Sequence, residues 1–286
     1  MKDISIIIPH KNTPELLKRC LNSIPVLRNV EIIVIDDNSN RNIVDFNNYP
    51  GSERLDIKII YTSKGNGAGY ARNIGLANAE GKWIIFADAD DFFAKNAFDI
   101  FNQYTDSDYD VIFFNAEGVM SNDTLIPSKR TDYYRKMVLD SDINAIRYKS
   151  SVPWAKMIRH RTIREYDIKF DETIVANDAF FSCILGVNAK KVGKDLHTVY
   201  FCTEEDTSLK MKIQSKNDRV TRYLVTMKCN RYLKKRGLND YYNYPGVWLF
   251  KSSKIKDWLP LRYLIHYLLF FKKKAITDAY WFLRYN

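Results

Sequence analysis

Four short apolar runs in the first part of the chain predict four buried strands, at residues 4–8, 31–35, 57–61 and 82–87. Runs of this length, bounded by glycine, proline or polar residues, are typical of strands that are covered on both faces. Residues 14–24 follow helical spacing after Thr13, a typical helix start, and residues 70–79 form a second helical segment. This alternation predicts an α/β fold, a mainly parallel sheet with helices on both faces.

An acidic cluster follows the fourth predicted strand directly, in the order Asp88, Ala89, Asp90 and Asp91. In extended backbone, side chains two residues apart point the same way, so Asp88 and Asp90 project to one side. Open α/β sheets bind ligands at the carboxyl ends of their strands. Oxygen ligands alone suit a hard divalent cation, Mg²⁺ or Mn²⁺. A solvated acidic turn that caps the next helix is the alternative interpretation.

Other polar loops are expected at the same edge of the sheet, at residues 9–12 and 36–39. A glycine-rich loop, 65–69, precedes the second helix, and its N–H groups could bind phosphate. It lacks the signature of a P-loop and follows the third strand, so a flexible connector is equally compatible with it. Arg72 adds a cation one turn into the helix. Together these features indicate a site for a nucleotide diphosphate and a metal.

Charge and aromatic residues change along the chain. The 286 residues, with a net charge of +10, fit one large domain or one and a half. From Lys210 onward, Lys and Arg dominate and aromatic residues crowd in, which indicates an anionic partner. Residues 258–271 are apolar but interrupted, and they suit a membrane surface beside the lysines at 272–274. A packed helix pair or a homodimer face is the alternative, and nucleic acid is disfavoured because no recognised binding motif is present.

The cysteines and the N-terminus help to predict the cellular location of the protein. Four cysteines lie far apart without a paired motif, which predicts reduced, buried thiols in a cytosolic protein: Cys20, Cys183, Cys202 and Cys229. The N-terminus does not have the pattern of a signal peptide. No stretch reaches the about 18–20 apolar residues that a membrane-spanning helix needs. We therefore expect a cytoplasmic protein, peripheral on the inner face of the cell membrane.

Five motifs resemble, in order and spacing, those of family 2 glycosyltransferases with the Rossmann-like GT-A fold: residues 5–12, 20–24, 32–39, 71–76 and 86–91. The resemblance covers residues 1–115. It implies an inverting hexosyltransferase that moves a sugar from a nucleotide sugar with the help of Mn²⁺ or Mg²⁺. Uridine is favoured over guanosine or thymidine by the resemblance alone.

The resemblance also implies roles for single residues. Asp37 matches the carboxylate that reads the uracil ring, Asp88 the one near the ribose, and Asp90, in the Asp-x-Asp motif, the metal ligand that bridges to the diphosphate. The donor-binding residues implied are Pro9, Asn12, Asp37, Gly67, Arg72, Asp88, Ala89 and Asp90. The chain departs from the common pattern at His10, Lys11 and Gly65, which puts the base or sugar preference in question.

The middle of the chain resembles the family's second half, at residues 150–159, 168–173 and 177–181. There the family has a Glu-Asp-x-x-Phe motif whose Asp is the catalytic base, which corresponds to Asp178. An inverting transfer needs a base for the proton of the acceptor hydroxyl. Asn177 stands where the preceding acid is common, so the tuning of the base is in question. An acid that stabilises a helix N-terminus is the alternative.

Several further residues are weaker candidates. Trp154 could stack on an acceptor sugar and Lys156 could contact phosphate, but a core tryptophan and a solvated lysine are the more ordinary interpretations. His197 could be an extra metal ligand, although a structural histidine is commoner. Residues 203–208 are a candidate lid over the donor.

The sequence thus predicts two regions. Residues 1–209 form a GT-A glycosyltransferase domain, with the nucleotide sugar bound by 1–115 and the acceptor and base in 116–209. Residues 210–286 form a helical, basic and aromatic extension for a membrane surface or a dimer. The expected reaction is transfer from a UDP-sugar to a glycan or lipid-linked acceptor in surface polysaccharide synthesis. A sugar nucleotidyltransferase, whose glycine-rich first loop is missing here, and a non-catalytic nucleotide- or glycan-binding scaffold are the alternatives.

Overall fold

The computed structural model describes residues 2–140, 142–205, 216–243 and 261–271. Contacts divide the chain into two compact units, Met1–Met211 and Lys212–Asn286. The first unit holds a nine-stranded sheet, and the described part of the second is helical. All four cysteines are buried and form no disulfide, as the sequence predicts.

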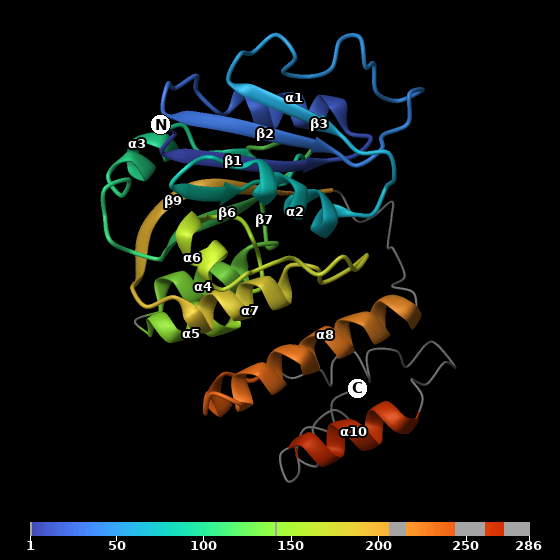
Figure 1. Ribbon diagram of the computed structural model, residues 1–286, viewed down its shortest axis with the longest axis vertical. Coiled ribbons are helices and arrows are strands. Elements are labelled where there is room, and N and C mark those ends of the chain that lie inside the picture. The colour runs from blue at the N-terminus through green and yellow to red at the C-terminus, as the bar shows by residue number, and fades with distance from the viewer. Residues whose placement is uncertain (1, 141, 206–215, 244–260, 272–286) are drawn as a thin grey trace. The chain divides into compact units, whose positions relative to one another are not determined.

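The first half of the sheet is parallel, in the order β3-β2-β1-β4 (Figure 1). Its strands are β1 (Ile4–His10), β2 (Val30–Asp36), β3 (Ile57–Tyr61) and β4 (Trp83–Phe86). The apolar residues of β1, β2 and β4 are buried, as their continuous apolar runs predict. The side chains of β3 are half-buried or exposed along its whole length, because it is the edge strand. The carboxyl ends of all four strands meet at one edge.

The second half of the sheet contains both parallel and antiparallel pairs, within the α/β fold that the sequence predicts. There β8 (Lys156–Arg159) runs antiparallel between β4 and β6 (Val111–Met120). The long strand β9 (Val192–Glu204) pairs parallel to β6, and the register shifts next to Asn115 accompany its curved path (Figure 1). Two short strands, β5 (Phe92–Phe93) and β7 (Pro127–Ser128), pair antiparallel with β9 and β6.

Helices cover the sheet and bring the site residues to its edge. On the parallel half, α2 (Ala68–Asn78) packs on β1 and β2, where Gly75 allows close approach: a Cβ there would lie 2.3 Å from Ile7 Cγ2. The helices of this unit besides α2 are α1 (Pro14–Asn22), α3 (Ala97–Asn102), α4 (Asp132–Leu139), α5 (Ile143–Lys149), α6 (His160–Glu165) and α7 (Ala179–Asn188). The helices α4 to α7 lie together on one side of the sheet, where α5 contacts α4 and α7, and α6 contacts α7 (Figure 1).

The second unit contains α8 (Lys216–Lys234), the short 3₁₀ helix η1 (Asn239–Tyr241) and α10 (Leu261–Phe271). Its core is an aromatic cluster in which Tyr223 and Met227 of α8 pack with Tyr267 and Phe271 of α10. Within the described residues, none of the helices combines the length and the apolar character needed to cross a membrane. The predicted membrane-surface residues at 258–260 and 272–286 lie outside the described residues.

Candidate active site

The acidic turn, Asp88–Asp91, lies directly after β4 at the carboxyl edge of the parallel strands. Carboxylate oxygens of Asp88, Asp90 and Asp91 all lie within 4.8 Å of one another, and among the described residues these three form the one acidic group that could hold a metal ion. The turn is closed by the N–H of Asp91, which donates to the carbonyl of Asp88 at 3.1 Å. The structure thus brings Asp88 and Asp90 together as the sequence predicts and adds Asp91, which the motif spacing did not indicate.

The electrostatics of the acidic turn favour a bound cation. Burial, followed by the charge of Asp88, raises the pKa of Asp90. Burial and the charges of Asp88 and Asp90 raise the pKa of Asp91 well above its usual range. The Asp91 Oδ1 atom accepts from the N–H of Thr203 at 2.8 Å, but Oδ2 is buried without a partner. Hard oxygen donors that repel one another, one with an unused buried oxygen, fit Mg²⁺ or Mn²⁺.

Three elements hold the backbone of the acidic turn. Arg19 of α1 donates through Nη2 to the carbonyl of Asp90 at 2.6 Å. The hydroxyl of Thr203, in β9, donates to the same carbonyl at 2.6 Å, and Arg130 donates to the carbonyl of Thr203. Sequence reasoning missed these three supporting residues. They lie far from the turn along the chain, and no local pattern marks an arginine or threonine that serves a distant carbonyl.

Arg72 connects the acidic turn to the segment before the predicted base. Its Nη2 donates to Asp88 Oδ1 at 2.5 Å, and its Nη1 donates to Asn177 Oδ1 at 3.0 Å. The guanidinium also lies over the ring of Phe170, 5.3 Å from the centroid, and the side chain is 5% exposed. Asn177, the departure from the family motif, is therefore an acceptor for this bridge.

Asp178 lies at the N-terminus of α7, where its side chain makes no capping hydrogen bond. Burial raises the pKa of Asp178. Arg72 opposes that rise, Asp88 adds to it, and Lys156 also opposes it. A partly buried carboxylate that does not cap its helix is available to accept a proton, which suits a general base.

The segment before Asp178 is docked on the first turns of α2. The side-chain amide of Asn73 donates to the carbonyl of Phe170 at 3.0 Å, and its Oδ1 accepts from the N–H of Phe170 at 2.9 Å. Gly69 lets the two segments touch, because a Cβ there would lie 2.2 Å from the carbonyl oxygen of Asp171. The helix that carries Arg72 thus also holds the segment that precedes Asp178.

Asp37, the residue predicted to read the uracil ring, holds the glycine-rich loop in place. Its carboxylate accepts from the N–H groups of Asn66 and Gly67, both at 2.9 Å, and from Lys11 Nζ at 3.4 Å. Two loop N–H groups that could bind phosphate are therefore already used. Asn12 adopts a left-handed backbone, and its Oδ1 accepts from the N–H of Asn40 at 2.7 Å. Pro9 lies in β1 next to this loop.

A buried polar cluster explains the departure at His10. The Nδ1 atom of His10 lies 3.0 Å from Asp36 Oδ2 and 2.6 Å from the hydroxyl of Tyr49, which donates to Asp36 at 3.0 Å. The N–H of Thr13 donates to His10 Nε2 at 3.2 Å, so the ring proton is on Nδ1. Burial alone would raise the pKa of Asp36, but hydrogen bonds from His10, Ser39 and Tyr49 hold it below its usual value. The cluster fixes the ends of β1 and β2.

The weaker predictions meet a different outcome. Trp154 is 6% exposed and packs in the core against Tyr134 and Tyr200, so its ring is not presented to an acceptor. A solvated Lys156 is wrong: the side chain is 1% exposed, and its Nζ donates to the carbonyl of Val152 at 2.5 Å. His197 is exposed and pairs with Asp195 at 2.7 Å, outside the acidic cluster. Residues 206–208 of the predicted lid lie outside the described residues.

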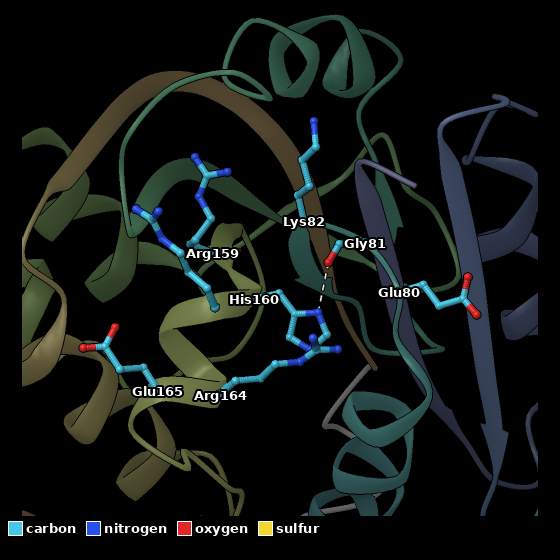
Figure 2. A pocket seen from close by; sticks show the side chains of 8 residues that line it. Glu80, Gly81, Lys82, Arg159, His160, Arg164 and Glu165 are labelled. Atoms are coloured by element: carbon cyan, nitrogen blue, oxygen red, sulfur yellow. Dashed lines mark hydrogen bonds between the residues drawn. The ribbon is translucent and has the colours of Figure 1, made fainter. Parts of the chain in front are cut away.

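A pocket of about 600 Å³ opens at the other end of β4 (Figure 2). Lys82, Arg159, His160 and Arg164 line it, and His160 Nδ1 lies 2.9 Å from the carbonyl of Gly81. Lys82 pairs with Asp3, and Arg159 donates to backbone carbonyls and stacks on Trp83. The pocket thus lies at the sheet edge opposite the acidic turn, and its cations serve protein partners.

Known proteins resemble this chain in sequence. The sequence model described as Glycosyl transferase family 2 matches residues 5–175. The poly(ribitol-phosphate) beta-N-acetylglucosaminyltransferase TarP of Staphylococcus aureus is 29% identical over 217 residues, 72% of this chain and 64% of TarP. The glycosyltransferase GlyG of Streptococcus pneumoniae is 29% identical over 115 residues, 39% of this chain and 38% of GlyG. The chain therefore spans less than two thirds of either relative.

Solved structures resemble it in fold. Residues 1–349 of S. aureus TarS, in complex with UDP-GlcNAc, superpose with a TM-score of 0.67 at 20% identity, over 97% of this chain and 80% of that one. The mannosyltransferase PcManGT of Pyrobaculum calidifontis, in complex with GDP-Man and Mn²⁺, gives 0.58 at 13% identity, over 98% and 84%. These likenesses concern the fold, a curled sheet flanked by helices.

Proposed function

The chain belongs to glycosyl transferase family 2, and we propose that it transfers a sugar from a UDP-sugar to a hydroxyl group with inversion at C1. The observation that carries this proposal is the bridge of Arg72 between Asp88 of the acidic turn and Asn177 beside Asp178. The bridge supports a single site in which the proposed metal–diphosphate half and the proposed base half lie together. A non-catalytic scaffold would not need both halves to be linked.

The donor is proposed to lie along the carboxyl edge of β1, β2 and β4. Its binding residues are those that the family motifs mark: Pro9, Asn12, Asp37, Gly67, Arg72, Asp88, Ala89 and Asp90. UDP-GlcNAc is the first donor to test, because TarP is named an N-acetylglucosaminyltransferase and a TarS structure contains this nucleotide sugar.

Asp88, Asp90 and Asp91 would hold Mn²⁺ or Mg²⁺, with Asp90 as the principal ligand. When bound, the cation would offset the negative charge that builds on the diphosphate leaving group. The buried Oδ2 of Asp91 and the mutual repulsion of the three carboxylates support this assignment. Arg72 adds a donor next to the same charge.

The base half completes the reaction. Asp178 takes the proton from the acceptor hydroxyl as the hydroxyl oxygen forms its bond to C1 of the sugar. The bond from C1 to the diphosphate breaks on the opposite face, and UDP leaves with that electron pair. Only the ionised form of Asp178 can do this. Burial opposes the ionisation of Asp178, and the charge of Arg72 favours it.

The acceptor is proposed to be a glycan, a lipid-linked glycan or a polyol-phosphate polymer of the cell surface. Two relatives support the last class by name: TarP, and a poly(ribitol-phosphate) beta-glucosyltransferase of Bacillus spizizenii that is 25% identical over 205 residues. The sugar and the linkage follow from binding tests, not from the motif residues.

Residues 210–286 are proposed to touch an anionic membrane surface from the cytoplasm, with a homodimer as the alternative. Exposed apolar side chains on α10, at Ile265, Leu268 and Leu269, and the basic composition of this region support a surface contact. Sedimentation of the protein with anionic and neutral vesicles tests it. Binding to neither, together with a dimeric mass in solution, would favour the dimer.

Calorimetric titration with UDP-GlcNAc, UDP-glucose and GDP-mannose, each with Mn²⁺, Mg²⁺ or a chelator, tests the proposed donor site. Metal-dependent binding of a UDP-sugar is the expected result. Binding of none under any condition would favour a scaffold, and metal-independent binding would remove the metal from the proposal.

A further inference from the structure

Lys156 is a buried cation that the donor and acceptor assignments leave without a role. It begins β8, and its side chain is 1% exposed. Its Nζ donates to the carbonyl of Val152 at 2.5 Å and lies 5.1 Å from the centroid of the Phe113 ring. No carboxylate lies within ion-pairing distance among the described residues. Such a lysine costs folding free energy unless something compensates it.

The position of Lys156 connects it to the first turn of α7. The carbonyl of Val152, which accepts from Lys156, also lies 3.4 Å from the hydroxyl of Ser182. Ser182 is four residues after Asp178, so the two lie on the same face of α7, and its N–H donates to the carbonyl of Asp178 at 3.0 Å. The ammonium thus lies beneath the turn that presents Asp178, and the opposing charge that it feels is that of Asp178.

The other charges around Asp178 show why a nearby Lys156 matters for its ionisation. From α2, Arg72 favours the ionised carboxylate, but Arg72 is already bound to Asp88, whose own charge opposes ionisation. From β8, Lys156 favours ionisation, and within the described structure it faces no other carboxylate. Burial alone raises the pKa of Asp178. A base in this environment needs a cation that is not shared with the metal-binding turn.

We propose that Lys156 is a positioning residue for the base: its buried ammonium is the dedicated counter-charge that keeps the Asp178 carboxylate ionised and ready to accept a proton. The proposal rests on the proposed role of Asp178 as the base. Lys156 touches neither donor nor acceptor in this account, and it acts through Asp178 alone. Burial lowers the pKa of Lys156 to about 7, so its charge is lost near neutral pH, and the support it gives to Asp178 weakens above that.

The direct test is the titration of the Asp178 carboxyl carbon, followed by NMR with ¹³C-labelled aspartate and assigned with Asp178→Asn. In Lys156→Met the pKa of Asp178 is expected to rise by about one unit, the scale of losing one nearby opposite charge. Lys156→Arg is expected to retain the wild-type value. Lys169→Met, which removes an exposed lysine near the base segment, is the matched control and should change nothing. An unshifted carboxyl in Lys156→Met overturns the proposal.

A reciprocal measurement covers the case in which Lys156→Met does not fold. In Asp178→Asn, which keeps the shape of the side chain, the pKa of Lys156 is expected to fall, because coupling between two sites is mutual. The NMR signal of the lysine Cε reports it, and an unchanged value overturns the proposal.

Both titrations are independent of sugar transfer, so they separate this proposal from the proposed function. In active enzyme, the acid limb of kcat/KM should move upward in Lys156→Met by the same amount as the carboxyl. A shifted carboxyl with an unshifted acid limb would leave the charge pair intact and remove Asp178 from the role of base, and with it the role proposed for Lys156.

Discussion

The Nη2 atom of Arg72 donates to Asp88 Oδ1 across 2.5 Å, and this contact connects α2 to the acidic turn at the carboxyl edge of the sheet. The other Nη atom of the same guanidinium reaches Asn177 at 3.0 Å. One side chain thereby connects the acidic turn to the segment that precedes Asp178. An arginine suits this position because its planar fork presents several donors in fixed directions.

Arg72→Lys tests whether that fork is needed. A lysine keeps the charge but cannot hold Asp88 and Asn177 in the same planar geometry. We expect kcat/KM to fall by about 10²-fold, the scale of losing one preorganised donor. Arg161→Lys, at an exposed arginine near the opposite edge of the sheet, should behave like wild type. An Arg72→Lys enzyme with wild-type kinetics would show that the bridge does not contribute to catalysis.

Asp178→Asn removes the proposed base and is expected to lower kcat by about 10²–10⁴-fold, with a smaller change in donor binding. The pH profile of the wild type carries the second half of this prediction. Burial raises the pKa of Asp178, and a base works only when deprotonated. Activity should therefore fall, as the pH decreases, at a higher pH than an exposed aspartate would give. If the same fall in activity at low pH persists in Asp178→Asn, the fall must be due to the titration of another group.

Asp90→Asn tests the metal assignment. Loss of one carboxylate from the acidic turn should weaken the dependence on Mn²⁺ and lower activity by about 10²–10³-fold. The measurement is a titration of activity with metal, after treatment with a chelator. Asp106→Asn, at an exposed aspartate, is the control. Equal metal responses in Asp90→Asn and the control would contradict the assignment.

Tyr49→Phe tests the buried cluster of His10, Asp36 and Tyr49. The hydroxyl donates to a charged carboxylate at 3.0 Å, so its loss should cost about 1.5–3 kcal/mol in free energy of unfolding at pH 7. The pKa of Asp36 is lowered in the fold, so its contribution is present above its unfolded pKa of about 3.9 and is lost as the pH falls through the folded value. Denaturant unfolding at pH 7 and pH 3 should show the difference shrinking in acid. The exposed Tyr133→Phe is the control.

Lys156→Met should raise the melting temperature at pH 6, because it removes a buried ammonium. The lysine has a pKa of about 7 in the fold and about 10.4 when unfolded. The cost of its charge is therefore complete below pH 7 and declines as the pH rises toward 10. The gain from the substitution should decline in the same range. Equal melting temperatures of the two proteins at every pH would mean that the ammonium carries no such cost.

The sequence predicts the parallel half of the sheet and the acidic turn because both depend on local patterns. The apolar residues of the runs at 4–8, 31–35 and 82–87 are buried, and the motif carboxylates follow the last of these runs. The antiparallel insertion of β8 between β4 and β6 has no comparable local signal, since strand partners are chosen by tertiary packing. This is why the antiparallel pairs in the second half of the sheet could not be predicted from the sequence.

The site shows the same division. Asp88 and Asp90 could be found from spacing, but Asp91 joins them through a backbone turn that the hydrogen bond from its N–H to the carbonyl of Asp88 closes. The burial of Lys156 was not predicted, because a single lysine is usually solvated and the local sequence does not show which elements pack around it. Arg19 and Thr203 support the turn from far along the chain, through backbone carbonyls that any residue would supply.

The initial rate of UDP release from UDP-GlcNAc, with a ribitol-phosphate oligomer as acceptor, tests the account most directly. We predict release that needs the oligomer and Mn²⁺ or Mg²⁺, stops with a chelator, and yields a product of inverted anomeric configuration. Release that is equally fast without metal and in Asp178→Asn would contradict a site in which the acidic turn and Asp178 act together.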